Sequence, residues 1–189
     1  MMDKIGKIQS HFQSIMEILG LDLTDPSLMG TPRRIAKMYV NEIFSGLDMD
    51  NYPRIMCVPN EFDSDEMVVV RGITVHSVCE HHFVPFIGVC HIGYIPKKTV
   101  LGLSKFNRIV KYFSRRPQLQ ERLTSDIHGD LTKVLDTDDI GVVVDASHLC
   151  VKIRGIQQDS KTVTSKLSGV FRDNINTRNE FMTLCGISK

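Results

Sequence analysis

The chain lacks tryptophan, and aromatic residues make up only 7% of its 189 residues. It also lacks an excess of either charge. Its 23 basic and 22 acidic residues leave a net charge of +1, which argues against a general nucleic-acid-binding or membrane-surface protein. No apolar run approaches the length of a membrane span, and we find no N-terminal signal segment. The hydrophobic content of 42% is sufficient for the core of one domain.

Cysteine is also scarce. The five cysteines are an odd number and do not have the spacing of a disulfide framework, so we expect reduced thiols and a cytoplasmic protein. In that compartment, cysteines and histidines that lie close together indicate a metal or catalytic site more often than a disulfide bond. Two stretches have this character, Cys79-Glu80-His81-His82 and His148-Leu149-Cys150.

Together these two stretches offer three ligands for zinc. Cys79 and His82 are three residues apart, a spacing that lets one turn of chain wrap a tetrahedral ion. His148 and Cys150 are two apart, so on a strand both would point to one face. We expect zinc to be bound by Cys79, His82 and Cys150, because three protein ligands plus water are typical of a catalytic site. His81 and His148 remain beside them as acid or base candidates at neutral pH.

A zinc-activated water indicates hydrolysis but does not name the substrate. Five basic side chains would suit a polyphosphate if the fold brought them together, and each is otherwise an ordinary solvated charge. They are Arg34, Lys37, Lys105, Arg108 and Arg154. In the same way, Cys150 can alternatively be read as a buried strand cysteine without a metal.

Apolar spacing predicts five helices. The second starts with Thr31 as its N-cap and Pro32 as its first residue, and Ser104 is the expected cap of the third. The predicted ranges are 3–19, 31–44, 105–116, from 117 onward, and about 177–184. The last of these follows a polar tail at 159–170.

β-Branched runs predict four strands. The expected ranges are 67–75 (running on into Cys79), 86–95, 140–146 and 149–156, with bends at Gly88 and Gly93 and a connecting segment at 51–65. Short connections within each pair of strands predict an α+β fold with a four-stranded antiparallel sheet and two helices on one face. We divide the chain into an N-terminal helical segment at 1–50 and a catalytic domain at 51–189. The open sheet edges favour oligomers.

Several motifs, in this order, resemble the GTP cyclohydrolase I family over most of the chain. They are residues 31–39 (TPRRIAKMY), 79–83 (CEHHF), 93–96 (GYIP), 102–108 (GLSKFNR), 116–124 (RPQLQERLT) and 148–155 (HLCVKIRG). The resemblance implies a zinc enzyme that hydrolyses GTP to 7,8-dihydroneopterin triphosphate and formate, the first step of tetrahydrofolate biosynthesis. It also implies the tunnelling fold, and a homodecamer of two pentamers with active sites shared between subunits.

The resemblance further implies roles for individual residues. A zinc-activated water attacks C8 of guanine, and the residue that matches His148 protonates N7. Ring opening, formate release, an Amadori-type rearrangement and ring closure follow. His81 matches a histidine near the imidazole ring, Ser104 a residue near the ribose, Gln120 a pocket residue and Glu121 the anchor of guanine. The triphosphate is held at positions matching the five basic residues named above.

Two alternatives stay open. The first is another enzyme of the same fold. It could be the nitrile reductase of queuosine synthesis, which uses a cysteine nucleophile and a nicotinamide cofactor, or a pyruvoyl-tetrahydropterin synthase, which binds zinc through three histidines. The second is a non-catalytic, zinc-stabilised oligomeric binding module. Such a module needs a fourth protein ligand, for which His81 and His148 are the candidates.

Overall fold

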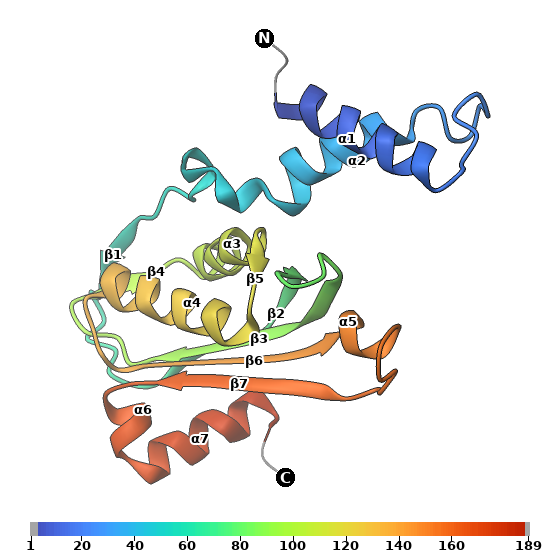
Figure 1. Ribbon diagram of the computed structural model, residues 1–189. Coiled ribbons are helices and arrows are strands. Elements are labelled where there is room, and N and C mark those ends of the chain that lie inside the picture. The colour runs from blue at the N-terminus through green and yellow to red at the C-terminus, as the bar shows by residue number, and fades with distance from the viewer. Residues whose placement is uncertain (1–3, 188–189) are drawn as a thin grey trace.

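The computed structural model describes residues 4–187, and Figure 1 shows a pair of N-terminal helices set above a layered body. Helices α1 (Lys4–Ile18) and α2 (Thr31–Met38) pack against each other. A π-helical turn (Tyr39–Ile43) and two 3-10 turns (Ser45–Leu47 and Met49–Asn51) then carry the chain to the body. Both predicted N-terminal helices are confirmed, although residue 3 lies outside the described residues.

The body contains a five-stranded sheet in the order β5-β2-β3-β6-β7. The four long strands are antiparallel neighbours: β2 (Val68–Cys79), β3 (Pro85–Tyr94), β6 (Ile140–His148) and β7 (Lys161–Leu167). The two-residue β5 (Pro117–Gln118) pairs in parallel with the end of β2. A separate small sheet joins β1 (Cys57–Pro59) to β4 (Thr99–Leu101). The predicted α+β class with a four-stranded antiparallel sheet is confirmed, with β5 as an addition.

Helices α3 (Leu103–Ser114) and α4 (Gln120–Leu135) cover one face of the sheet, as the sequence predicts (Figure 1). Successive residues of a strand face opposite sides, so every second side chain of β2, β3 and β6 enters this core. The strand residues buried there include Ile73, Val75, Phe86, Cys90, Ile92, Val142 and Val144.

The other face is covered at one end by α6 (Val170–Asp173) and α7 (Ile175–Cys185), which lie below the sheet in Figure 1. Gly93 and Gly141 face each other across β3 and β6. A Cβ atom on either glycine would lie within 2.8 Å of the Phe181 ring. Gly93 therefore makes room for an aromatic ring, a role different from the bend that the sequence suggested.

The expected strand at 149–156 is wrong. The strand β6 ends at His148, and the chain turns at once into the short helix α5 (Leu149–Lys152), in which Ile153 N donates to Leu149 O at 3.0 Å. The fourth strand is instead β7, within the segment expected to be a tail. It pairs with β6 along seven residues, and the Thr164 hydroxyl, in place of an apolar side chain, contacts Gln120 and Thr124 of α4.

Three helix starts and one connection also differ from expectation. Gly30, not Thr31, is the cap residue of α2, and Thr31 is the first residue of the helix, where its Oγ1 accepts from the Arg34 guanidinium at 2.7 Å. Likewise Gly102, not Ser104, precedes α3. The helix expected from Pro117 starts at Gln120, because Pro117 and Gln118 pair with the end of β2. The connection at 51–65 contains β1. None of the helices in residues 4–187 is long and apolar enough to cross a membrane.

Candidate metal centre

The end of β2 turns sharply through residues 79–83, here called the metal loop. Cys79 N donates to Val84 O, and Phe83 N donates to Cys79 O, both at 2.9 Å. Phe83 adopts a left-handed backbone with φ of 53°, a conformation that non-glycine residues rarely take outside tight turns. This turn places Cys79 and His82 on the same side of the loop, facing α5.

The three predicted ligands meet here. The ligand atoms of Cys79, His82 and Cys150 all lie within 4.8 Å of one another. Cys150 reaches the cluster from α5, so its position comes from a helical turn and not from the strand geometry expected from the sequence. Nδ1 of His82 lies 3.9 Å from Cys79 Sγ, and NH1 of Arg154 lies 2.9 Å from its Nε2. The ring atom directed at the cluster is therefore Nδ1.

This donor set fits zinc. Two cysteine sulfurs and one imidazole are ligands that a catalytic zinc ion takes in proteins, with a fourth position left for water. Burial, together with a hydrogen bond to Cys79, raises the pKa of the Cys150 thiol. A metal ion at this point would favour the thiolates, since a coordinating thiol is deprotonated.

His148 stands next to this cluster at the end of β6. Its ring stacks on Phe86, with centroids 4.6 Å apart and planes inclined by 14°. Its Nε2 lies 2.7 Å from Gln120 Oε1. The amide nitrogen of Gln120 donates to Val144 O at 3.0 Å and Thr162 O at 2.8 Å, so the amide oxygen must face His148. His148 therefore donates from Nε2, and in the neutral ring Nδ1 carries the free lone pair.

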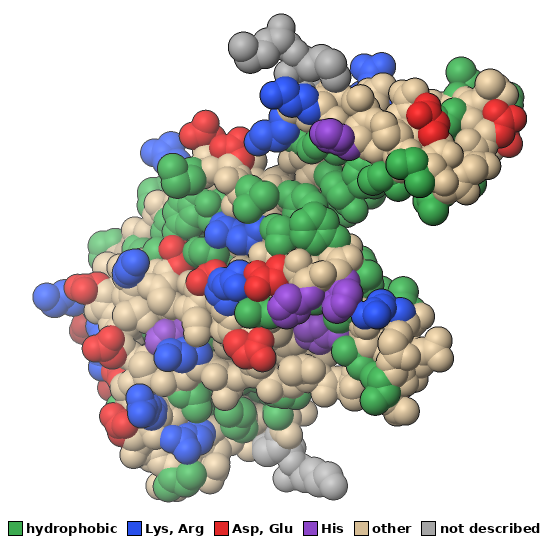
Figure 2. All heavy atoms as spheres, in the orientation of Figure 1, with side chains coloured by type: hydrophobic (Ala, Val, Ile, Leu, Met, Phe, Trp, Pro, Cys, Tyr) green, Lys and Arg blue, Asp and Glu red, His purple; other side chains and the backbone are tan. Residues whose placement is uncertain are grey.

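Burial favours the neutral form of this imidazole. Burial lowers the pKa of His148, and the nearby Glu121 carboxylate offsets part of that effect. Glu121 follows Gln120 in the first turn of α4, where a negative charge interacts favourably with the helix dipole. His81, the other predicted acid or base, has Nδ1 at 3.9 Å from Cys79 Sγ. Figure 2 shows histidine side chains gathered on this side of the molecule, with acidic and basic residues beside them.

The predicted phosphate-binding residues are spread over the chain. Arg154 contacts His82 in the cluster, but Arg34 donates to Ser27 O at 2.9 Å within the N-terminal segment. Lys105 Nζ donates to Arg54 O at 2.7 Å. Lys37 and Ser104 are exposed on α2 and α3. One chain, over its described residues, does not bring the five basic residues together.

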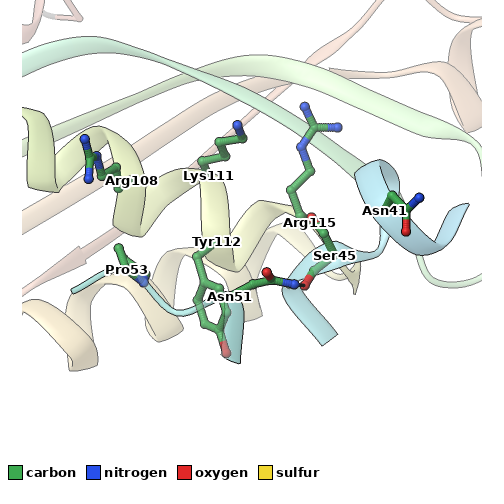
Figure 3. Close-up of a pocket in the computed structure, with 9 residues that line it drawn as sticks. Asn41, Ser45, Asn51, Pro53, Arg108, Lys111, Tyr112 and Arg115 are labelled. Carbon is green, nitrogen blue, oxygen red and sulfur yellow. Dashed lines mark hydrogen bonds between the residues drawn. The ribbon is translucent and has the colours of Figure 1, made fainter. Parts of the chain in front are cut away.

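Arg108 instead lines a pocket of about 350 Å³ between α3 and the segment that follows α2. Figure 3 shows Arg108 and Lys111 projecting from α3, Arg115 directly after the end of α3, and Asn41, Ser45 and Asn51 from the segment that follows α2. The pocket joins three cations with amide and hydroxyl groups, which is suitable chemistry for an anion.

The metal loop also contacts the N-terminal segment. Ring contacts run from Phe12 to Tyr39 at 5.3 Å, from Tyr39 to Phe44 at 5.0 Å and from Phe44 to Phe83 at 5.2 Å. Each spacing lies in the range of favourable aromatic pairs. The sequence analysis missed Phe83 in this role, although it directly follows the ligand His82.

Glu80 and Arg122 are two further residues that the sequence analysis left without a role. Arg122 makes a two-pronged ion pair with Glu80, from NH1 to Oε2 at 2.6 Å and from NH2 to Oε1 at 3.0 Å. The signal in the sequence was weak, since the two residues are 42 positions apart. What pointed to Glu80 was its place between a cysteine ligand and two histidines.

Comparison with known proteins gives a consistent result. The family model described as GTP cyclohydrolase I matches residues 8–186. The GTP cyclohydrolase 1 of Aeromonas salmonicida (strain A449) is 53% identical over 180 residues, 95% of this chain and 83% of the relative. That of Yersinia pestis is 54% identical over 177 residues, 93% of this chain and 80% of the relative.

Among solved structures, the apo form of the archaeosine synthase QueF-Like is similar at 19% identity and a TM-score of 0.42. The match covers 55% of this chain and 93% of that chain. A likeness this weak bears neither on the site nor on the activity.

Proposed function

The chain belongs to the GTP cyclohydrolase I family, and from this premise we propose that Cys79, His82 and Cys150 bind the zinc ion at which it hydrolyses GTP. The GTP cyclohydrolase I activity itself follows from the family match and from relatives about half identical over nearly the whole chain. Because the chain is a GTP cyclohydrolase I, the alternatives left open by the sequence do not apply. These were a nitrile reductase, a pyruvoyl-tetrahydropterin synthase and a non-catalytic binding module.

The observation that carries the proposal is the convergence of two sulfurs and one imidazole within 4.8 Å, beside a histidine whose tautomer is fixed. When bound at such a site, zinc supplies a Lewis acid that lowers the pKa of a coordinated water to about 7. Three protein ligands leave the open position that this chemistry needs.

In this mechanism His148 moves the proton that N7 of guanine requires. Its Nε2–H remains hydrogen-bonded to Gln120 Oε1, so Nδ1 is the ring nitrogen that can take up and release a proton. The lowered pKa keeps the resting ring neutral near pH 7, ready to take a proton from water and pass it on. Stacking on Phe86 restricts ring rotation, so the donor atom keeps its direction. We assign His81, whose Nδ1 lies 3.9 Å from Cys79 Sγ, an assisting role at the same end of the substrate.

Glu121 selects guanine in this mechanism. A carboxylate can accept from N1–H and the 2-amino group at once, a pattern that adenine does not offer. Gln120, the preceding residue, acts through His148. The proposal is supported by the adjacency of Gln120 and Glu121 in the first turn of α4, since a base bound by Glu121 would lie close to the residue that orients His148.

The basic residues that bind the triphosphate are proposed to come from more than one subunit. Arg154 lies at the cluster, whereas Arg34, Lys37, Lys105 and Arg108 lie elsewhere in the chain. A shared site in a homodecamer of two pentamers, with Ser104 near the ribose, would unite them. The largely exposed edge strand β7 supports assembly through the sheet. The decamer, the boundary at 50/51 and a cytoplasmic location stay predictions.

The experiment is formate release from GTP by zinc-loaded protein, with the pterin product followed by its absorbance and fluorescence. We expect one formate per pterin. Cys150→Ser should lose both tightly bound zinc and turnover. Cys57→Ser is the matched control, because a hydroxyl can replace the Cys57 thiol that donates to Val134 O at 3.3 Å. A full equivalent of tightly bound zinc in Cys150→Ser would contradict its role as a ligand.

A further inference from the structure

The metal loop and the guanine-binding turn are joined by an ion pair to which no role has yet been given. Glu80 follows the ligand Cys79 and precedes His81. Arg122 is the third residue of α4 and follows Gln120 and Glu121. Its guanidinium makes two parallel hydrogen bonds to the carboxylate, at 2.6 and 3.0 Å. This fork geometry fixes direction as well as distance between the two segments.

A backbone contact reinforces the same junction. Glu80 N donates to Gln118 O at 3.1 Å, directly after β5 pairs with the end of β2. The Gln118 side chain in turn donates to Oδ2 of Asp126 at 3.2 Å, and Asp126 lies one turn of α4 beyond Arg122. Glu80 thus connects the metal loop to the region around the start of α4 twice. Its backbone N–H contacts Gln118, and its carboxylate contacts Arg122.

The ion pair is too exposed to matter much for folding. The Arg122 and Glu80 side chains keep 46% and 29% of their surface accessible to solvent. Exposed pairs of this kind contribute little to the stability of a fold. A contact that stabilises little, yet holds two site segments with two-point geometry, is better explained by positioning.

We propose that the Glu80–Arg122 ion pair is a positioning element that holds the metal loop in register with the guanine-binding turn of α4. Both residues act through their neighbours, Glu80 through Cys79 and His82, and Arg122 through Gln120 and Glu121. The inference rests on the proposed function, because it assumes that the loop binds zinc and that the turn binds guanine. It adds that this side-chain contact, together with the Glu80 N–Gln118 O hydrogen bond, sets the separation between these two subsites.

The test is a double-mutant cycle with Glu80→Gln, Arg122→Gln and the double variant, measured in the full-length protein. Removing partners that orient metal ligands costs about 10–100-fold in affinity or activity. We expect each single variant to bind zinc about tenfold more weakly in competition with a chelator. At saturating zinc, kcat should fall about tenfold with little change in KM. The double variant should be no worse than the worse single, since both changes break one contact.

The control is Lys97→Ala, which removes another exposed ion pair, to Asp139 at 2.8 Å, away from the metal loop. It should leave zinc affinity and kcat unchanged, and all variants should unfold within a few degrees of the wild type. Losses that multiply in the double variant, or zinc affinity and kcat equal to the wild type in the single variants, would overturn the inference.

The two proposals fail in different ways. A wild-type protein without formate release would defeat the proposed function, while the zinc-affinity cycle would still decide whether Glu80 and Arg122 act as one unit. A fully active wild type whose variants match it in zinc affinity and kcat would defeat the positioning role alone.

Discussion

The side-chain oxygen of Gln120 accepts a hydrogen bond from Nε2 of His148 across 2.7 Å, which joins the first turn of α4 to the last residue of β6. Two backbone carbonyls hold the amide nitrogen of Gln120, so the amide cannot flip without losing both contacts. A glutamine thereby decides which nitrogen of a neighbouring histidine can exchange a proton.

Replacing His148 with alanine should lower kcat by about 10²–10⁴-fold, because that is the usual contribution of a general acid or base. GTP binding should persist, as measured by equilibrium binding to the zinc-loaded protein. Gln120→Ala should lower kcat about 10–100-fold and alter its pH profile, because the imidazole loses its fixed tautomer.

The combined variant Gln120→Ala/His148→Ala should be no slower than His148→Ala alone. Thr164→Val is the control, because Thr164 contacts both Gln120 and Thr124 without touching His148. If the double variant were slower than His148→Ala by the full Gln120 factor, the glutamine would have a role of its own.

Glu121→Gln should weaken guanine binding selectively. Hydrogen bonds to a charged group contribute about 1.5–3 kcal/mol, so KM for GTP should rise about 10–100-fold. Inhibition by inorganic triphosphate should stay the same, because that probe carries no base. Competition by ATP against GTP should become stronger relative to the wild type. An unchanged preference for GTP over ATP would refute the assignment, and Glu61→Gln, at an exposed site, is the control.

Gly46→Ala should destabilise the protein, because the segment after α2 passes very close to α3. A Cβ at Gly46 would lie 2.2 Å from Tyr112 O and 2.8 Å from Arg115 O, and both are backbone atoms that cannot swing away. The expected loss is about 1–3 kcal/mol of unfolding free energy, measured by denaturant titration.

Gly129 provides the opposite case. It lies within α4, and a Cβ there would meet nothing within 4 Å. Gly129→Ala should therefore stabilise by up to about 1 kcal/mol through helix propensity. Equal effects of the two substitutions would mean that the approach at Gly46 is looser than described.

His128 should make stability depend on pH. Burial first, and the nearby Lys166 second, lower its pKa, and its side chain is only 8% exposed. In the unfolded chain the imidazole takes up a proton as the pH falls through about 6.5, while the folded state resists it until a lower pH. Stability is therefore fully present above that pH and declines below it, by at most about 1.4 kcal/mol per pH unit.

The measurement is the unfolding free energy from pH 7.5 to pH 5 for the wild type and His128→Gln. A glutamine amide can still donate to Ser168 Oγ, which lies 2.8 Å from His128 Nε2. The variant should show a shallower decline toward acid pH. His11→Gln, on the exposed side of α1, should retain the full slope. Identical slopes for the wild type and His128→Gln would show that His128 charges equally in both states.

Periodicity was sufficient to predict α1 to α4, α7 and the central strands, because their apolar faces pack against one another, but it missed α5 and α6. It failed at β7, which is largely exposed and whose Thr164 hydroxyl contacts Gln120 and Thr124, so that its sequence looks like a polar tail. Pro117 looked like a helix start, but pairing with the end of β2 decided its conformation. In both cases long-range hydrogen bonds overrode local preference.

For the site, residue type proved more informative than predicted structure. Cys150 reaches Cys79 and His82 although the predicted strand does not exist, since a helical turn delivers the sulfur to the same place. The contact between Glu80 and Arg122 could not be predicted, because nothing in either segment alone indicates that the two meet. The five basic residues stay unassembled in one chain, which no periodicity could have revealed.

The ring contacts Phe12–Tyr39, Tyr39–Phe44 and Phe44–Phe83 form a continuous series that connects helix α1 to the metal loop. Phe83 follows the ligand His82 directly and has a left-handed backbone, so it can hardly shift without moving its neighbour. Packing of the N-terminal segment from Phe12 to Phe44 therefore helps to set the position of the metal loop.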